Sequence, residues 1–232
     1  MPDSGAGSAP RRSGSGAAGT AARGQVRHSY RGRSVSERQE ERRGLFEDAA
    51  LTVFAEKSYA GSTITDVCRE AGLSRRQFYE LYESRDQLLV EVYDRIQRDA
   101  QRVVDEALAG DDPDARAVIA AAVRAYVTSI AADPRRIAVA FVEIVGVSAE
   151  IEAHRAEMRR AWGAKIVAGV VKRPDLGAPA CGWAVAMAGF IGAVNAAVHE
   201  WSSASDRPPV ADLAEMLTAV LFALVRPESG SN

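Results

Sequence analysis

The fold is decided by residues 63–82, TITDVCREAGLSRRQFYELY, which contain two short helical patterns around a tight turn. Thr63 is suited to cap the first helix, with Asp66 at its third helical position, and Ser74 is suited to cap the second. Gly72 permits the sharp reversal between them, because glycine adopts left-handed backbone angles without steric cost. The residues that would pack one helix on the other are apolar or small: Val67, Cys68, Ala71, Leu73 and Phe78. This pattern predicts a helix-turn-helix, whose second helix enters the major groove of DNA.

The start of the second helix carries side chains that suit base recognition: Ser74, Arg75, Arg76 and Gln77. Arginine can donate two hydrogen bonds to guanine, and glutamine can pair with adenine. Tyrosine hydroxyls and helix N-terminal amides commonly hold phosphates, and Tyr79 and Tyr82 follow within two turns. Residues 36–82 are not basic as a whole, with seven cations and nine anions. The motif, rather than the composition, therefore predicts DNA binding.

Helical periodicity continues from residue 36 to about residue 225, and no convincing alternating strand or internal repeat interrupts it. Capping residues, glycines and prolines divide it into nine expected helices joined by short turns. The expected ranges are 36–57, 64–71, 74–82, 84–109, 114–132, 133–147, 149–172, 179–202 and a last helix that follows Pro208-Pro209 and ends near 225. The sequence therefore predicts an all-α protein.

Composition and the expected helix ends divide the chain into four segments. Residues 1–35 hold six arginines against one aspartate and few large apolar residues, so a disordered Arg-rich tail is expected. Residues 36–95 would form a small N-terminal unit, 96–226 a larger C-terminal unit, and 227–232 a flexible C-terminus. The tail is either a solvated leader or an arm that binds a polyanion, with its arginines entering a minor groove. The candidates for that contact are Arg27, Arg31 and Arg33.

Other classes of protein find little support. Cys68 and Cys181 lie far apart and form no Cys-x-x-Cys pair, so no metal site or disulfide framework is indicated and a reducing cytoplasm is expected. Residues 176–198 carry no charge over a length that could cross a bilayer, but they are mostly Ala and Gly, which favours a buried helix over a membrane helix. His199-Glu200 begins a zinc-protease-like string that Ser203 breaks. No enzyme activity and no cofactor are therefore expected.

Residues 44–89, GLFEDAALTVFAEKSYAGSTITDVCREAGLSRRQFYELYESRDQLL, resemble the TetR family of bacterial one-component regulators. The resemblance lies in the phenylalanine and AEKSY that close the first helix, the threonine at 63 and the AGLS turn. It continues through the aromatic pair at 79 and 82 and the SRDQLL opening of the fourth helix. It implies a nine-helix protein in which 36–95 bind DNA and 96–226 bind a ligand and form a dimer.

The same resemblance implies roles for individual residues. Thr63 would cap its helix and contact phosphate, and residues 74–77 would face the groove. Tyr79 and Tyr82 would brace the unit and contact the DNA backbone, and Arg85 would bind phosphate from the start of the fourth helix.

Three positions depart from the family pattern. Ser58 stands where glycine usually ends the first helix, so a left-handed conformation there would carry strain. Arg76 stands where glycine is frequent and adds a cation to the recognition surface. Glu80 would repel phosphate if it faced the DNA backbone, so it is expected to pair with Arg76 one turn earlier.

A homodimer through the eighth and ninth expected helices is also implied. In the eighth helix, Ala188, Gly192 and Ala196 recur every four residues and would permit close helix approach. A two-fold dimer would place two recognition helices about one DNA turn apart, matching a palindromic operator. The alternative is that both helices form the core of a monomer.

The resemblance further implies a pocket for a small-molecule effector. Glu143 is its main candidate, because its helical neighbours are apolar or small and a buried carboxylate must be paired or neutralised. It would bind the ligand or form a salt bridge with an internal arginine such as Arg124. Weaker candidates, which are as consistent with an ordinary core, are Tyr126, Phe141, Trp162, Trp183 and Asn195.

The sequence therefore predicts a ligand-responsive DNA-binding transcriptional regulator, in its leading form a repressor that a small-molecule effector releases from its operator. The alternative is an all-helical small-molecule-binding or catalytic protein whose N-terminal unit mediates protein contacts.

Overall fold

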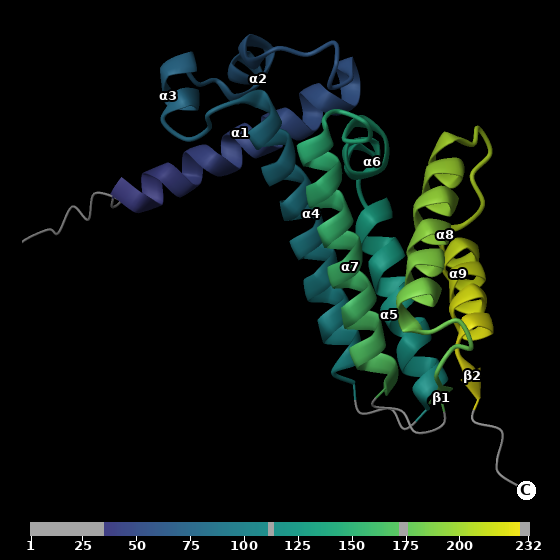
Figure 1. The fold of residues 1–232 in the computed structure, drawn as a ribbon. Helices are drawn as coiled ribbons and strands as arrows, with labels where there is room; N and C mark the ends of the chain where they lie inside the picture. The colour runs from purple at the N-terminus through teal and green to yellow at the C-terminus, as the bar shows by residue number, and fades with distance from the viewer. Residues whose placement is uncertain (1–34, 111–113, 172–175, 228–232) are drawn as a thin grey trace, which may run out of the picture. The chain divides into compact units, whose positions relative to one another are not determined.

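The computed structural model describes residues 35–110, 114–171 and 176–227 (Figure 1). The predicted Arg-rich tail, with its three candidate minor-groove arginines, lies outside these residues except for Val35, and so does most of the predicted C-terminal segment.

Nine α-helices are present in the described ranges, which confirms the all-α prediction. They are α1 (Val35–Lys57), α2 (Ile64–Ala71), α3 (Arg75–Tyr79), α4 (Arg85–Leu108), α5 (Ala115–Ala131), α6 (Pro134–Ile137), α7 (Ala149–Val171), α8 (Trp183–Ser203) and α9 (Val210–Leu224). A π-helical turn, η1 (Ala138–Glu143), follows α6 directly. Two strands of two residues, β1 (Leu176–Gly177) and β2 (Arg226–Pro227), pair antiparallel.

Side-chain caps fix where the helices begin. Thr63, Ser74, Ser84, Asp114 and Asp133 each accept a hydrogen bond from a backbone N–H in the first turn of the helix that follows. These bonds satisfy amides that have no partner within the helix. The capping residues read from the sequence therefore mark the starts of these five helices, whereas α8, expected from residue 179, begins at Trp183 without a side-chain cap.

The helix predicted over 133–147 is the main departure from expectation. The α-helical part stops at Ile137, and the chain continues as η1, in which Ile144 N–H donates to the Val139 carbonyl five residues earlier, at 3.2 Å. Gly146, three residues after the end of η1, takes a positive φ of 72°. The axis of α6 and η1 is bent by 98° from that of α5.

The described residues belong to one compact unit with one continuous core, and the predicted N-terminal and C-terminal units both contribute to it. In the N-terminal unit, Phe46, Phe78 and Tyr82 form an aromatic group with ring centroids 5.5 to 6.1 Å apart. In the C-terminal unit, α5 packs on α4 and α9, and α8 packs on α7 and α9 (Figure 1). Because α1 also packs on α4, α6 and η1, the N-terminal unit is joined to the bundle by several elements.

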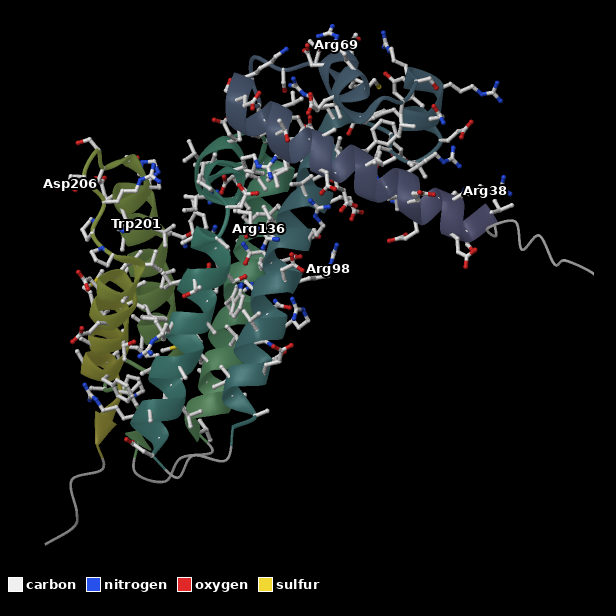
Figure 2. All side chains as sticks on the ribbon, turned by 180° about the vertical axis from the view of Figure 1, so that it is seen from behind. Arg38, Arg69, Arg98, Arg136, Trp201 and Asp206 are labelled. Carbon is white, nitrogen blue, oxygen red and sulfur yellow. The ribbon has the colours of Figure 1, made fainter. Side chains whose placement is uncertain are left out.

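Polar side chains reinforce this junction. Arg95 of α4 forms ion pairs with Glu47 and Asp48 of α1, at 3.3 and 2.8 Å. Arg136, labelled in Figure 2, pairs with Asp99 of α4 at 2.9 Å. Within the described ranges, no single helix is long and apolar enough to cross a membrane.

Candidate nucleic-acid interface and ligand cavity

Helix α2 begins with a reciprocal capping box. The Thr63 hydroxyl accepts from the Asp66 N–H at 3.1 Å, and the Asp66 carboxylate accepts from the Thr63 N–H at 3.0 Å. The ion pair with Lys57, 2.8 Å away, and the bonds from Thr63 hold the pKa of Asp66 well below its usual range. Thr63 stays exposed at the helix N-terminus, where amide groups and the helix dipole attract anions.

Helix α3 also begins with a reciprocal capping box. The Ser74 hydroxyl accepts from the Gln77 N–H at 3.3 Å, and the Gln77 side-chain carbonyl accepts from the Ser74 N–H at 2.9 Å. The Gln77 carbonyl is therefore occupied by the cap, and its amide NH₂ is the group that is left for a base. The box fixes the first turn of α3, from which Arg75 and Arg76 extend.

The cations of α3 are presented to solvent. Arg75 is exposed, and the side chain of Arg76 keeps 90% of its accessible surface. Tyr79 is 51% exposed, with its ring edge-to-face against buried Phe78 at 5.4 Å. The exposed face of α3 therefore offers two guanidinium groups and a phenol, all of which can donate hydrogen bonds to DNA.

Tyr82 is not part of the exposed face of α3. Only 1% of its area is exposed, and its hydroxyl is buried without a hydrogen-bond partner in the described part of the chain. Burial raises its pKa above the ordinary tyrosine value. The expected bracing role fits this position, whereas the expected contact with the DNA backbone does not, because the hydroxyl is enclosed.

Arg85 is also more constrained than expected. It donates a hydrogen bond to the Ser62 carbonyl, and its guanidinium carbon lies 4.1 Å from the centroid of the Tyr59 ring. The Tyr59 hydroxyl in turn bonds to Asp86, and burial followed by this bond raises the pKa of Tyr59 to about 12. Arg85 thus tethers the segment before α2 to the start of α4, instead of extending freely toward a phosphate.

Glu80 is neutralised by two cations. It lies 3.4 Å from Arg76, as the sequence predicts, and 2.9 Å from Arg42 of α1. The second partner is 38 residues away in sequence, so helical spacing could not reveal it. These contacts remove much of the repulsion that an acidic residue beside DNA would cause.

Ser58 adopts the strained conformation expected for a residue in the place of glycine. Its φ is 62°, the only positive φ of a non-glycine residue among those described. Its hydroxyl accepts from the Gly61 N–H at 3.1 Å. Gly61 is itself required, since a Cβ there would lie 2.5 Å from the Lys57 carbonyl oxygen.

A cavity of about 100 Å³ lies in the C-terminal unit, between α4, α5, η1, α7, α8 and α9. Four of the six predicted ligand-site residues line it: Tyr126, Phe141, Trp162 and Asn195. The Trp162 N–H donates to the Gln97 side-chain carbonyl at 2.8 Å, and Asn195 donates to the Ile191 carbonyl at 2.7 Å. Trp183 packs at the edge of the core and does not line the cavity.

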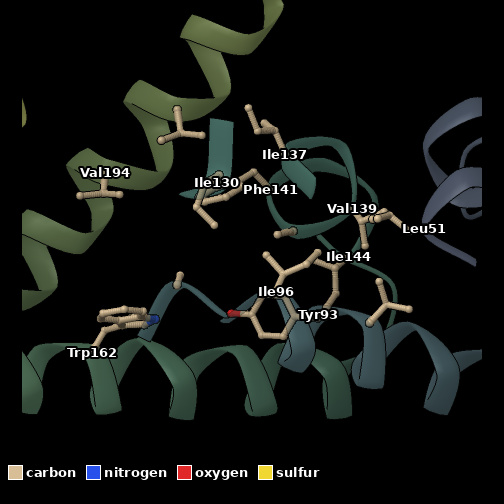
Figure 3. Packing of buried hydrophobic residues seen from close by; sticks show 14 of the residues in the cluster. Leu51, Tyr93, Ile96, Ile130, Ile137, Val139, Phe141, Ile144, Trp162 and Val194 are labelled. Carbon is tan, nitrogen blue, oxygen red and sulfur yellow. The ribbon is translucent and has the colours of Figure 1, made fainter. Parts of the chain in front are cut away.

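Glu143 is not among the residues that line the cavity, and its observed partner is a backbone amide rather than Arg124. Its carboxylate accepts a hydrogen bond from the Tyr59 N–H at 2.6 Å, and Arg124 is exposed. Glu143 ends η1, whereas Ala140 and Phe141 of the same turn line the cavity. Figure 3 shows Val139 of this turn beside Leu51 of α1. The turn η1 therefore contacts both the cavity and the N-terminal unit.

Comparisons with known proteins agree with this architecture. Residues 48–92 match the family model of the bacterial regulatory proteins of the tetR family. No curated protein matches the sequence.

Several solved structures have the same fold. FadR from Bacillus subtilis, in complex with stearoyl-CoA, is 16% identical with a TM-score of 0.67, over 77% of this chain and 96% of that one. The fatty acid degradation regulator FadR from Bacillus halodurans is 16% identical with a TM-score of 0.66, over 78% and 94%. A tetR-family regulatory protein from Rhodococcus RHA1 is 21% identical with a TM-score of 0.63, over 82% and 99%.

At these identities the structures establish the fold, and the family model adds the sequence of the helix-turn-helix region. The chain therefore has the fold of the tetR family of bacterial transcriptional regulators, and its residues 48–92 match the model of that family.

Proposed function

We propose that the protein is a homodimeric repressor that binds a palindromic operator and is released by a small molecule bound in the bundle cavity. The observation that carries this proposal is the turn η1. One side of it lines the cavity, and Glu143 at its end is hydrogen-bonded to the helix-turn-helix unit. A ligand that moved this turn would change the placement of α3 through that contact.

DNA recognition is assigned to exposed groups of α2 and α3. Arg75, Arg76 and the Gln77 amide would contact bases, and Thr63, Ser74 and Tyr79 would contact phosphates. Tyr82 and Arg85 would act indirectly, by holding the unit together. This division follows their exposure and their internal hydrogen bonds.

Dimerisation is assigned to the outer face of α8 with α9. Val185 is 63% exposed, and a Cβ added at Gly189 or Gly192 would meet no atom within 4 Å. On α9, Met216 is 43% exposed. A row of small residues beside large apolar ones suits a close helix pair across a two-fold axis.

Regulation follows from differential affinity. A ligand shifts DNA binding only if it binds the DNA-competent conformation less tightly than the released one. After the 98° bend that follows α5, α6 and η1 pack against α1. A ligand in the cavity could therefore act on α1 through these two short elements. The similar FadR from Bacillus subtilis is described in complex with stearoyl-CoA, and a small-molecule effector is proposed for this chain as well.

The test is a gel-shift titration of the full chain on DNA from upstream of its own gene, against a scrambled duplex at several salt concentrations. We expect a sequence-selective shift that weakens with salt. The double variant Arg75→Ala/Arg76→Ala should lose about 2–6 kcal/mol of binding free energy while staying folded.

The matched control removes the same charge elsewhere. Arg98 and Arg102 are exposed on α4, outside the helix-turn-helix, and Arg98→Ala/Arg102→Ala should bind nearly as the parent does. Equal affinity for the specific and scrambled duplexes, or equal losses in both double variants, would refute the groove assignment.

A further inference from the structure

The lining of the bundle cavity is apolar, with charge of only one sign. Its two charged residues in the described part of the chain are Arg159 and Lys165, both from α7, and no carboxylate lines it. A cation beside an apolar cavity is costly unless an anion compensates it. Whether protein carboxylates already neutralise these two cations therefore decides whether the cavity favours an anionic ligand.

Protein carboxylates already pair with three basic side chains of α7 other than Arg159. Lys165 lies 2.6 and 2.7 Å from the two carboxylate oxygens of Asp105. Arg155 lies 2.5 Å from Glu152, and His154 lies 2.7 Å from Asp94. These three pairs leave Asp105, Glu152 and Asp94 already engaged.

Arg159 differs from these cations. It is half-buried and lines the cavity, and in the described part of the chain no carboxylate lies within ion-pair distance of it. One turn earlier, Arg155 is 8% exposed and its Nε has no hydrogen-bond partner among the described residues. Helix α7 therefore carries guanidinium donors that the described protein groups do not satisfy, and of these two arginines Arg159 lines the cavity.

Two tyrosine hydroxyls add uncharged donors to the same cavity. Tyr93 and Tyr126 line it, and among the described residues neither hydroxyl makes a hydrogen bond to the protein. In Figure 3 the Tyr93 oxygen points toward the side where Trp162 lies, and the Trp162 indole nitrogen points back toward Tyr93. Burial raises the pKa of Tyr93 to about 12 and raises that of Tyr126 further, so both hydroxyls keep their protons at neutral pH.

We propose that the cavity binds a small amphipathic carboxylate, with its anionic head on Arg159 and its apolar body between α5, η1 and α8. The tyrosine hydroxyls would donate to the same head group. This inference deepens the proposed function, because it names the effector class for the cavity. The apolar body would contact Phe141, Phe190 and Val194, which line the cavity.

The size of the cavity limits that body. An apolar cavity of about 150 Å³ holds a single benzene ring, and this one measures about 100 Å³. The cavity is therefore smaller than the proposed ligand, so an alkyl chain as long as that of octanoate would enter as the helices that line the cavity move apart.

The experiment measures binding of three probes of equal chain length to the full chain without DNA, by calorimetry. The probes are octanoate, 1-octanol and octylammonium. We expect octanoate to bind at least about tenfold more tightly than 1-octanol, as a charge-assisted contact to a guanidinium provides. Octylammonium should bind least, because its head would lie beside Arg159.

Variants locate the head group. Arg159→Met keeps an unbranched side chain and should lose about tenfold in octanoate affinity while leaving 1-octanol unchanged, which also shows that the cavity is intact. Arg160→Met is the matched control, because Arg160 is exposed and does not line the cavity. Lys165→Met should have the smaller effect, since Asp105 already neutralises that ammonium.

Equal affinities for octanoate and 1-octanol, no octanoate binding at millimolar concentration, or equal losses in Arg159→Met and Arg160→Met would each overturn the proposal. Calorimetry without DNA separates this result from the proposed function. A selective gel shift with no octanoate preference removes only the effector class, whereas octanoate binding without a gel shift removes the regulator assignment.

Discussion

The hydroxyl of Tyr82 is a polar atom in an aromatic core. Edge-to-face contact with Phe46 and tilted contact with Phe78 account for the ring, and the Arg43 guanidinium carbon lies 5.6 Å from its centroid. No hydrogen bond reaches the oxygen in the described part of the chain. A buried, unsatisfied hydroxyl lowers stability by about 1–3 kcal/mol.

Tyr82→Phe should therefore raise the free energy of unfolding by about 1 kcal/mol, measured by urea denaturation, and leave DNA affinity unchanged. Phe78→Ala is the contrast, because removing the 0%-exposed ring should cost about 3–5 kcal/mol. A loss of DNA affinity in Tyr82→Phe would mean that the hydroxyl reaches the DNA backbone after all.

Ser58 affects the free energy of unfolding in two opposite ways, which substitutions can separate. A left-handed non-glycine residue costs about 1–2 kcal/mol, while the bond from Gly61 to its hydroxyl contributes about 1 kcal/mol. Both Ser58→Gly and Ser58→Ala lose the bond, and only the glycine variant relieves the strain.

We expect Ser58→Gly to be more stable than Ser58→Ala by about 1 kcal/mol in urea denaturation, with the glycine variant close to the parent. An alanine variant as stable as the glycine variant would show that the turn changes its backbone conformation when the hydroxyl is lost.

Helix starts were readable because they depend on residues close in sequence. Ser74 and Gln77 are three residues apart, and their mutual hydrogen bonds follow from that spacing alone. The surroundings of Tyr82 and Arg85 depend on residues that are distant in sequence, so spacing alone does not reveal that the Tyr82 hydroxyl is buried or that Arg85 bonds to Ser62. Glu143 shows the same limit, because its partner Tyr59 lies 84 residues away.

The element that sequence periodicity misjudged is η1. Apolar spacing over 133–147 fits one continuous α-helix, whereas the bond from Ile144 to Val139 widens the turn and re-aims the residues that follow. The extra residue in this turn accompanies the placement of Glu143 toward Tyr59, while Phe141 lines the cavity. A pattern of apolar residues alone does not distinguish these two helix types.

Glu143→Ala should lower the free energy of unfolding by about 2 kcal/mol, because the Tyr59 amide loses a charged acceptor. It should also reduce the factor by which octanoate lowers DNA affinity, since the tie between η1 and the helix-turn-helix is gone. Urea denaturation and gel shifts with and without octanoate measure the two effects. Glu150→Ala, at an exposed position near the start of α7, should change neither, and unchanged coupling in Glu143→Ala would exclude this route.

At the scale of the whole molecule, α8 has two faces with different tasks. Phe190, Ile191 and Val194 face the cavity, and Val185, Gly189 and Gly192 face outward. The sequence indicated the small-residue row, and the structure adds that it is exposed. A bulky charge on this row would prevent close approach of a second copy.

Gly192→Arg should convert a dimer into a monomer in light scattering during size-exclusion chromatography, and should weaken operator binding because two half-sites are no longer held together. Ala153→Arg, at an exposed position on α7, is the control and should remain dimeric. A dimer that survives Gly192→Arg would place the interface elsewhere.

The position of Trp162 gives the molecule an internal optical reporter. The chain has three tryptophans, and among them Trp162 lines the cavity, with its indole N–H bonded to Gln97. Trp201 instead bonds to the Pro208 carbonyl near the protein surface, and Trp183 lies at the edge of the core. With those two replaced by phenylalanine, the emission wavelength and intensity of the remaining indole would respond to whatever enters the cavity, without any added label.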